Sequence, residues 1–172
     1  YEKGHRTVVF LRNNESDYNR HSGYVVIFRE SLLAHAKELG MTVIESEHYE
    51  ADSFDAQHFV STVSAHPDRP NAIINQANAS VLSQVLMALH DAGMSIPQDV
   101  SVLSCGTYFE GEPTRFPITE MPVMPEELCA EAMNLLVSAI EEHTDIKGSV
   151  ELIEPALKRR GSVAEAGSGG TI

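Results

Sequence analysis

The chain has 172 residues, which is enough for one ordinary domain with a proper core. Its composition, 42% apolar and 22% charged, is typical of globular proteins and excludes the disordered class. The 25 acidic residues outnumber the 12 basic ones, so the net charge is −13. Because so acidic a surface repels phosphate backbones, we expect no direct binding of DNA by this chain.

Signals for membranes and export are missing from the sequence. No run of about eighteen apolar residues is present to span a membrane, and no apolar stretch follows the first residues as a signal peptide requires. The chain lacks an initiator Met and starts almost directly on an expected strand, so we expect a piece of a longer protein. Cys105 and Cys129 are expected to be small core residues in a reducing compartment rather than a disulfide.

Apolar runs and helical periodicities alternate along the first half of the chain. Residues 7–11 form a continuous apolar run, which predicts a strand covered on both faces. A polar loop over 12–19 leads to a helix at about 20–39, which Gly40 ends, and 41–44 form the next strand. The apolar residues that share one face of this helix are Val25, Phe28, Leu32, Ala36 and Leu39.

The same alternation continues through the middle of the chain. Asp52 or Ser53 is expected to cap a short helix that ends near Ala65. Residues 72–74 form a predicted strand, and a helix follows over 79–92. The inward positions of that helix are Leu82, Val85, Leu86 and Leu89.

A further buried strand is predicted at 100–103, after Gly93 has closed the preceding helix. Strands that alternate with helices at this spacing require βαβ crossovers. The sequence therefore predicts an α/β fold with a doubly wound parallel sheet.

The rhythm changes in the last third. Residues 106–117 hold too many glycines and prolines for a helix, and 118–121 are predicted to be extended. A helix is predicted at about 125–141, where Pro and two acids mark its start. A strand is predicted at 150–154, and residues 161–172 are expected to form a disordered tail. The predicted buried side of the helix consists of Leu128, Ala132, Leu135, Leu136 and Ile140.

Several segments of this sequence match the pattern of one family. The most specific segment is residues 93–102, which contains Ile96-Pro97-Gln98-Asp99-Val100-Ser101. The other matching segments are Gly4-His5-Arg6 before the first strand, Arg20-His21-Ser22-Gly23-Tyr24, Pro117-Ile118-Thr119 and Pro125-Glu126-Glu127-Leu128. Over about residues 3 to 160 the chain resembles the LacI/GalR transcriptional regulators.

The resemblance implies a periplasmic-binding-protein-like fold, in which two α/β lobes close on a small effector. It implies that residues 1–121 form the C-terminal lobe, that 122–146 hold a helix packing on an absent N-terminal lobe, and that 147–160 supply a closing strand. The apolar stripe of that helix would then lack its normal partner here, and we expect it to be loosely held, swapped or packed on another copy.

Two polar residues lie where the family contacts its effector. Arg20, three residues before Gly23, resembles the family's cleft Arg, and its guanidinium offers a planar set of donors to hydroxyls or a carboxylate. Asn78 resembles the Asn of the family's motif after the third strand of this lobe, where an amide both donates and accepts. Taken alone, Arg20 reads as a solvated residue at a helix start and Asn78 as a helix cap.

The loop after residue 105 departs from the family's pattern. Gly106-Thr107 stands where the family commonly has an Asp that accepts hydrogen bonds from the effector. A Gly offers no acceptor, and losing a charge-assisted contact costs about 1.5–3 kcal/mol. We therefore expect a divergent effector, less hydroxylated or anionic, or a sensor that has lost its ligand. Tyr108 or Phe109 supplies either a stacking face for it or a cap on the core.

The sequence contains no convincing catalytic or metal-binding pattern. One polar cluster suggests a metal site and consists of His48, Glu50, Asp52, Asp55 and His58. The cluster lacks the spacing of metal ligands, and its acids lie at a helix start. Ser104-Cys105-Gly106 lacks the first Gly of a nucleophile elbow. The loop after the first strand lacks the glycines and Lys of a phosphate loop. We expect no enzyme activity, no cofactor and no metal.

The leading hypothesis is the effector-sensing and dimerisation region of a cytoplasmic LacI/GalR-type regulator. Its partners would be a small-molecule effector, a second copy through the helix at 79–92 and the loop at 106–117, and DNA only through a helix-turn-helix outside this chain. The alternative is a sugar-binding protein of an ABC-type transport system, which shares the fold. A third reading is a stand-alone flavodoxin-like domain.

Overall fold

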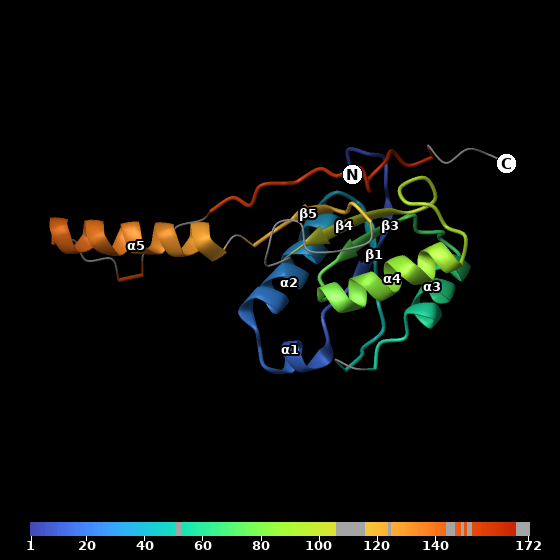
Figure 1. Ribbon diagram of the computed structural model, residues 1–172, viewed down its shortest axis with the longest axis horizontal. Coiled ribbons are helices and arrows are strands. Elements are labelled where there is room, and N and C mark those ends of the chain that lie inside the picture. Colours follow the sequence, from blue (N-terminus) through green and yellow to red (C-terminus); the bar gives the residue numbers. More distant parts are fainter. Residues whose placement is uncertain are drawn as a thin grey trace.

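A five-stranded parallel sheet forms the centre of the chain (Figure 1). The computed structural model describes residues 1–50, 53–105, 116–123, 125–143, 147–148, 150 and 153–167. The strands follow the order β2-β1-β3-β4-β5, and every neighbouring pair is parallel. Their bounds are β1 Thr7–Leu11, β2 Thr42–Glu45, β3 Ala72–Asn75, β4 Ser101–Cys105 and β5 Thr119–Met121. The α/β fold with a parallel sheet, predicted from the alternating pattern, is confirmed.

The helices lie close to their predicted places. Their bounds are α1 Glu15–Asn19, α2 Gly23–Glu38, α3 Ala56–Ala65, α4 Ala79–Asp91 and α5 Pro125–Glu142. The short α1 occupies what was predicted as a loop, because the Asn14 side chain accepts a hydrogen bond from the Asp17 N–H at 3.1 Å and caps it. Helix α2 consequently begins three residues later than expected.

The cap of α3 differs from the prediction. The side chain of Asp55 accepts a hydrogen bond from the backbone N–H of His58 at 2.9 Å, so Asp55 is the N-cap. Asp52, one of the two predicted caps, lies outside the described residues, and Ser53 instead hydrogen-bonds the backbone of Glu50. At the other helix ends the predictions hold: Gly40 and Gly93 have φ of +65° and +75°, the left-handed values expected after a helix.

The strand register divides the side chains between two faces of the sheet. Val9 pairs with Ile44 and Ile73, so these three side chains share the face that α3 and α4 cover (Figure 1). Phe10 points to the opposite face, where its ring lies 5.9 Å from that of Phe28 on α2. Helices on both faces of a parallel sheet explain why the strands read as continuous apolar runs.

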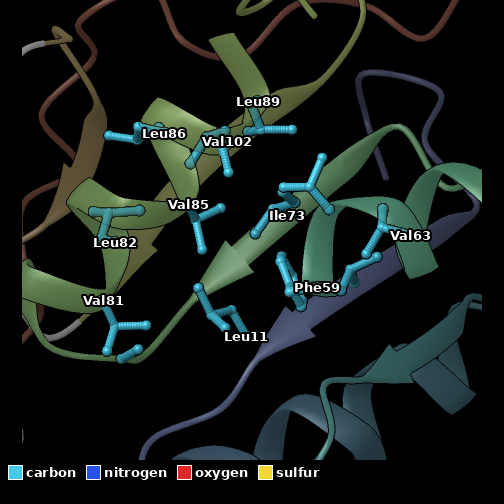
Figure 2. Packing of buried hydrophobic residues seen from close by; sticks show 14 of the residues in the cluster. Leu11, Phe59, Val63, Ile73, Val81, Leu82, Val85, Leu86, Leu89 and Val102 are labelled. Atoms are coloured by element: carbon cyan, nitrogen blue, oxygen red, sulfur yellow. The ribbon is translucent and has the colours of Figure 1, made fainter. Parts of the chain in front are cut away.

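The main core lies between the sheet and helices α3 and α4 (Figure 2). The four positions predicted to face inward on α4 are all nearly inaccessible, and Figure 2 shows them pointing toward the strands. The side chains that make this core include Leu11, Phe59, Ile73, Leu82, Val85, Leu86, Leu89 and Val102. The helical periodicity of α4 thus identified its buried face correctly.

Helix α5 is built differently from the others. It extends away from the sheet in Figure 1, and four of the five side chains predicted to be buried are exposed, among them Leu128 at 42%, Leu136 at 44% and Ile140 at 63%, whereas Leu135 is half-buried. Periodicity located the helix but not a covered face, because the covering surface is not provided by the described part of this chain. Cys129, predicted to be a core residue, is likewise exposed.

The C-terminal segment corrects two predictions. Residues 150, 153 and 154 of the predicted closing strand are not in a strand, and the segment instead meets the sheet later, through an antiparallel bridge between Lys158 and Glu120. The expected disordered tail is ordered from Ser162 to Ala166. Residues 168–172 lie outside the described residues.

Ser162 explains why a segment with little apolar surface is held in place. It is only 2% exposed, its hydroxyl donates to the Val102 carbonyl at 2.6 Å, and the same oxygen accepts from the Thr119 N–H at 2.7 Å. Its carbonyl accepts from the Val102 N–H at 2.8 Å. The segment therefore satisfies backbone groups of β4 and β5 that a bare strand end would leave unpaired.

Replacing Ser162 with Ala tests this docking. The change leaves the buried Thr119 N–H without its acceptor, so we expect unfolding free energy to fall by about 1–3 kcal/mol in urea denaturation. Ser138→Ala on the exposed side of α5 is the matched control and should be close to neutral. Equal losses of unfolding free energy for the two changes would contradict the docking of Ser162 on the sheet.

The ion pair between α2 and β2 gives the fold a defined pH dependence. Arg29 makes a bidentate contact with Glu45 at 2.6 and 2.7 Å, and these hydrogen bonds lower the pKa of Glu45. A carboxylate with a lowered folded-state pKa adds stability above its unfolded pKa, and loses it as pH falls through the folded-state value.

We therefore expect Glu45→Gln to destabilise the chain at neutral pH and to differ less from the original below about pH 4, near the ordinary Glu pKa. Because both side chains are partly exposed, the neutral-pH difference should be small. Denaturation at several pH values measures it, with Glu30→Gln on the exposed side of α2 as control. A difference that stays constant down to pH 2 would refute the assignment.

Candidate functional site

The carboxyl ends of the parallel strands meet at one edge of the sheet. Polar residues follow three of these strands: Arg12 to Asn14 after β1, Ser46 to His48 after β2, and Gln76 to Asn78 after β3. Ligands of open α/β sheets bind at this edge, because strands end there and helices begin. This edge is the candidate functional site.

Arg12 is the most constrained residue at this edge. It is 6% exposed, its N–H donates to the Ser46 hydroxyl at 3.2 Å, and its carbonyl accepts from the Tyr49 hydroxyl at 2.9 Å. Its guanidinium lies 4.5 Å from the centre of the Tyr18 ring. Both the backbone and the side chain of Arg12 therefore depend on the segment that follows β2.

His48 connects Arg12 with Glu15. The Arg12 Nη1 donates to His48 Nε2 at 2.7 Å, and a guanidinium can only donate, so Nε2 is the acceptor nitrogen of the ring. The proton of the neutral ring is then on Nδ1, which lies 2.6 Å from a Glu15 carboxylate oxygen. Glu15 also lies 3.6 Å from Arg12 Nη2, so it compensates the charge of the buried guanidinium. The Arg12 Nε has no hydrogen-bond partner among the described residues.

Tyr18 and Gln76 extend this network toward α2. The Tyr18 hydroxyl donates to Gln76 Oε1 at 3.1 Å, and Gln76 Nε2 donates to the Val25 carbonyl at 3.3 Å. Burial raises the pKa of Tyr18 and of Tyr49, so both hydroxyls keep their protons and remain donors at neutral pH. The edge is thus held by a network of internal hydrogen bonds around the buried Arg12 guanidinium.

The residues predicted to contact an effector have mixed positions. Arg20 follows α1 and is exposed, and its backbone N–H donates to the Ser16 carbonyl at 3.0 Å. Asn78 is the N-cap of α4, with its side-chain oxygen accepting from the Val81 N–H at 3.0 Å. The capping role of Asn78 is confirmed, and the ligand roles of both residues stay predictions. Gly106, Thr107 and Tyr108 lie outside the described residues.

The residues that organise this edge were not predicted from the sequence. From the sequence, Arg12 and Tyr18 were predicted only to lie in a polar loop, and no role was predicted for Gln76. One signal was available, because a polar residue directly after a buried strand lies at the carboxyl edge. Three partners of Arg12, namely Ser46, His48 and Tyr49, lie 34 to 37 positions away, and no local pattern indicates them.

The polar cluster that suggested a metal is divided in the structure. His48 lies against Glu15, whereas His58 lies 3.7 Å from Glu47. Among the described residues no group of three or more His, Cys, Asp or Glu side chains is placed to hold a metal ion. Within the same residues, none of the helices combines the length and apolar character that crossing a membrane requires.

Cys105 ends β4 at this edge and is buried, as predicted. Its carbonyl accepts from the Tyr24 hydroxyl at 3.4 Å, and burial raises the pKa of its thiol to about 12. Because the thiolate is the reactive form, such a thiol is inert at ordinary pH.

The two cysteines should therefore differ in reactivity. At pH 8 we expect Ellman's reagent to label one thiol per native chain, at Cys129, and both thiols after denaturation. Cys129→Ser should leave no rapidly labelled thiol in the native chain. Rapid labelling of native Cys129→Ser would show that Cys105 is accessible and that β4 is not buried as described.

Comparison with known sequences identifies one family. The sequence pattern described as the periplasmic binding protein-like domain matches residues 1–163. No curated protein matches the chain in sequence.

Solved structures share the fold at low sequence identity. A LacI family transcriptional regulator from Bifidobacterium animalis superposes with a TM-score of 0.75 at 22% identity, over 96% of this chain and 58% of that one. A LacI-family regulatory protein from Corynebacterium glutamicum gives 0.68 at 17% identity, over 95% and 61%. A LacI family regulator from an Arthrobacter species, solved with lactose, gives 0.65 at 19%, over 94% and 59%. The chain therefore spans less than two thirds of the length of these structures.

Proposed function

The chain belongs to the periplasmic binding protein-like domain family, and we propose that it is the effector-sensing part of a LacI/GalR-type transcriptional regulator. The observation that carries this proposal is the family match over residues 1–163, combined with a parallel sheet whose carboxyl edge gathers polar side chains. The segment around Ile96-Pro97-Gln98-Asp99 adds the resemblance to the regulators within this family.

The effector site in this proposal lies at the carboxyl edge of the sheet. Arg20 would donate to the effector from its exposed position, and Asn78 would donate through its side-chain amide while its oxygen caps α4. Gly106, Thr107 and Tyr108 would complete the contacts from the loop after β4. Position 106 lacks the family's carboxylate, so an effector less hydroxylated than a sugar, or an anionic one, fits better than a plain sugar.

A second lobe is the proposed partner of α5. The similar solved structures are longer than this chain, which covers 58% to 61% of the first two. The exposed apolar residues of α5, among them Leu136 and Ile140, would pack on the additional lobe and remove that surface from water. Effector binding between the lobes would shift the equilibrium between two lobe arrangements.

The remaining parts of the proposal concern the parent protein. A homodimer would form through the exposed side of α4 and the loop after β4, and a helix-turn-helix outside this chain would bind DNA in the cytoplasm. This division of labour is consistent with the net charge of −13, which is unsuitable for binding DNA directly. The alternative is a sugar-binding protein of an ABC-type transport system, which shares the fold.

The first test is the reading frame upstream of Tyr1, together with ligand binding by its product. We expect a helix-turn-helix and another α/β lobe upstream, and a melting temperature of the parent protein that rises with one member of a panel of lactose, other sugars, sugar phosphates and nucleosides. The 172-residue chain alone should show no shift with this panel, because half a cleft buries its ligand from one side only.

Variants then connect the response to the site. Arg20→Met should abolish the shift in the parent protein, whereas Arg159→Met, also exposed, should leave it unchanged. A cleavable signal peptide upstream would instead support the transport receptor. Full ligand response in Arg20→Met would contradict the assigned site.

A further inference from the structure

A cavity of about 140 Å³ lies between the edge strand β2 and helix α3, and its lining includes Ser46 to Tyr49, which border the carboxyl-edge site. Its floor is apolar, because Val9 and Ile44 are register partners that point to the same face of the sheet, beneath α3. Phe59 and Val63 of α3 close it from the other side. Strand β2 has a neighbour on one side only, and the cavity lies along this edge.

An aromatic wall closes one end of the cavity. The rings of Tyr49 and Phe54 meet edge to face at 4.9 Å, and the rings of Phe54 and Phe59 lie 5.8 Å apart. All three residues line the cavity. A cavity of about 150 Å³ lined by such side chains accepts one benzene ring, so this volume fits a single six-membered ring.

The rim of the cavity is acidic. The carboxylates of Glu47, which lies 3.7 Å from His58, and of Asp55, which caps α3, border it, whereas the neighbouring Glu45 forms a bidentate pair with Arg29. Among the described residues that line the cavity there is no Lys or Arg. Three histidines, His48, His58 and His66, complete the polar lining. An apolar interior with a carboxylate rim complements a molecule with one ring and one positive charge.

We propose that this cavity is a second ligand site, for a small aromatic amine. The ring occupies the apolar interior against Phe59 and Val63, and the ammonium group lies at the rim near Glu47 and Asp55. Three lining residues, Ser46, His48 and Tyr49, also hold Arg12 through hydrogen bonds. A ligand here therefore contacts the segment that positions Arg12 at the carboxyl edge.

Calorimetric titration of the 172-residue chain with three probes of similar size tests the proposal. The probes are 2-phenylethylamine, 2-phenylethanol and phenylacetate, and they differ in the charge of the group that ends the substituent on the ring. We expect the amine to bind about threefold to fivefold more tightly than the alcohol, and the carboxylate to bind weakest. Added salt should weaken binding of the amine and leave that of the alcohol unchanged.

Two variants separate the rim from the interior. Glu47→Gln, at a side chain that is 77% exposed, should remove the preference for the amine and leave binding of the alcohol unchanged. Glu38→Gln, 71% exposed on α2, is the matched control and should change neither. Thr62→Trp at the mouth should abolish binding of both probes without lowering the melting temperature, because Thr62 is exposed.

The outcomes distinguish this site from the effector site. Arg20→Met should leave binding of the amine intact, so failure of the proposed effector site and failure of this cavity are separate results. The proposal is overturned if no probe binds at millimolar concentration, if Thr62→Trp binds the amine as well as the original chain does, or if phenylacetate binds more tightly than the amine.

Discussion

The central position of β1 is the constraint on which the rest of the structure depends. It is hydrogen-bonded to β2 on one side and β3 on the other, and the register places Val9 on the α3 face and Phe10 on the α2 face. A slip by one residue would exchange these two sets and disrupt the packing on both faces. Because β1 is parallel to β2 and β3, all three strands end at the same edge of the sheet. Arg12, which follows β1, therefore lies next to the segments that follow β2 and β3.

Burial of Arg12 at that edge determines how the edge is organised. A buried guanidinium is costly unless it is paired, and here Glu15, His48 and the Tyr18 ring surround it. Their positions require α1 to form directly after β1, which the Asn14 cap makes possible. The same network holds the segment after β2 that lines the cavity between β2 and α3. The carboxyl edge and the cavity therefore share residues of the segment that follows β2.

The sequence predicted the elements that have a local cause and failed where the cause is distant. The inward face of α4 follows from spacing alone, and Gly40 and Gly93 end helices because few other residues adopt positive φ. By contrast, Ser162 is held by backbone groups of Val102 and Thr119, and nothing near residue 162 in the chain indicates those partners. Disorder was predicted for this segment because it can bury little apolar area, whereas its docking depends on hydrogen bonds.

Helix α5 and the candidate site show two different limits of such reasoning. Periodicity places Leu136 and Ile140 on one side of α5, but the surface that would cover them is not among the described residues of this chain. At the site, family resemblance directs attention to Arg20 and Asn78, whereas burial and hydrogen bonding make Arg12 the organising residue. The two roles are compatible, since Arg20 and Asn78 are exposed, as the proposed contact with an effector requires, and the buried Arg12 organises the edge through its hydrogen bonds. A ligand bound at this edge would therefore be affected by Arg12 through the segment after β2, which also lines the cavity.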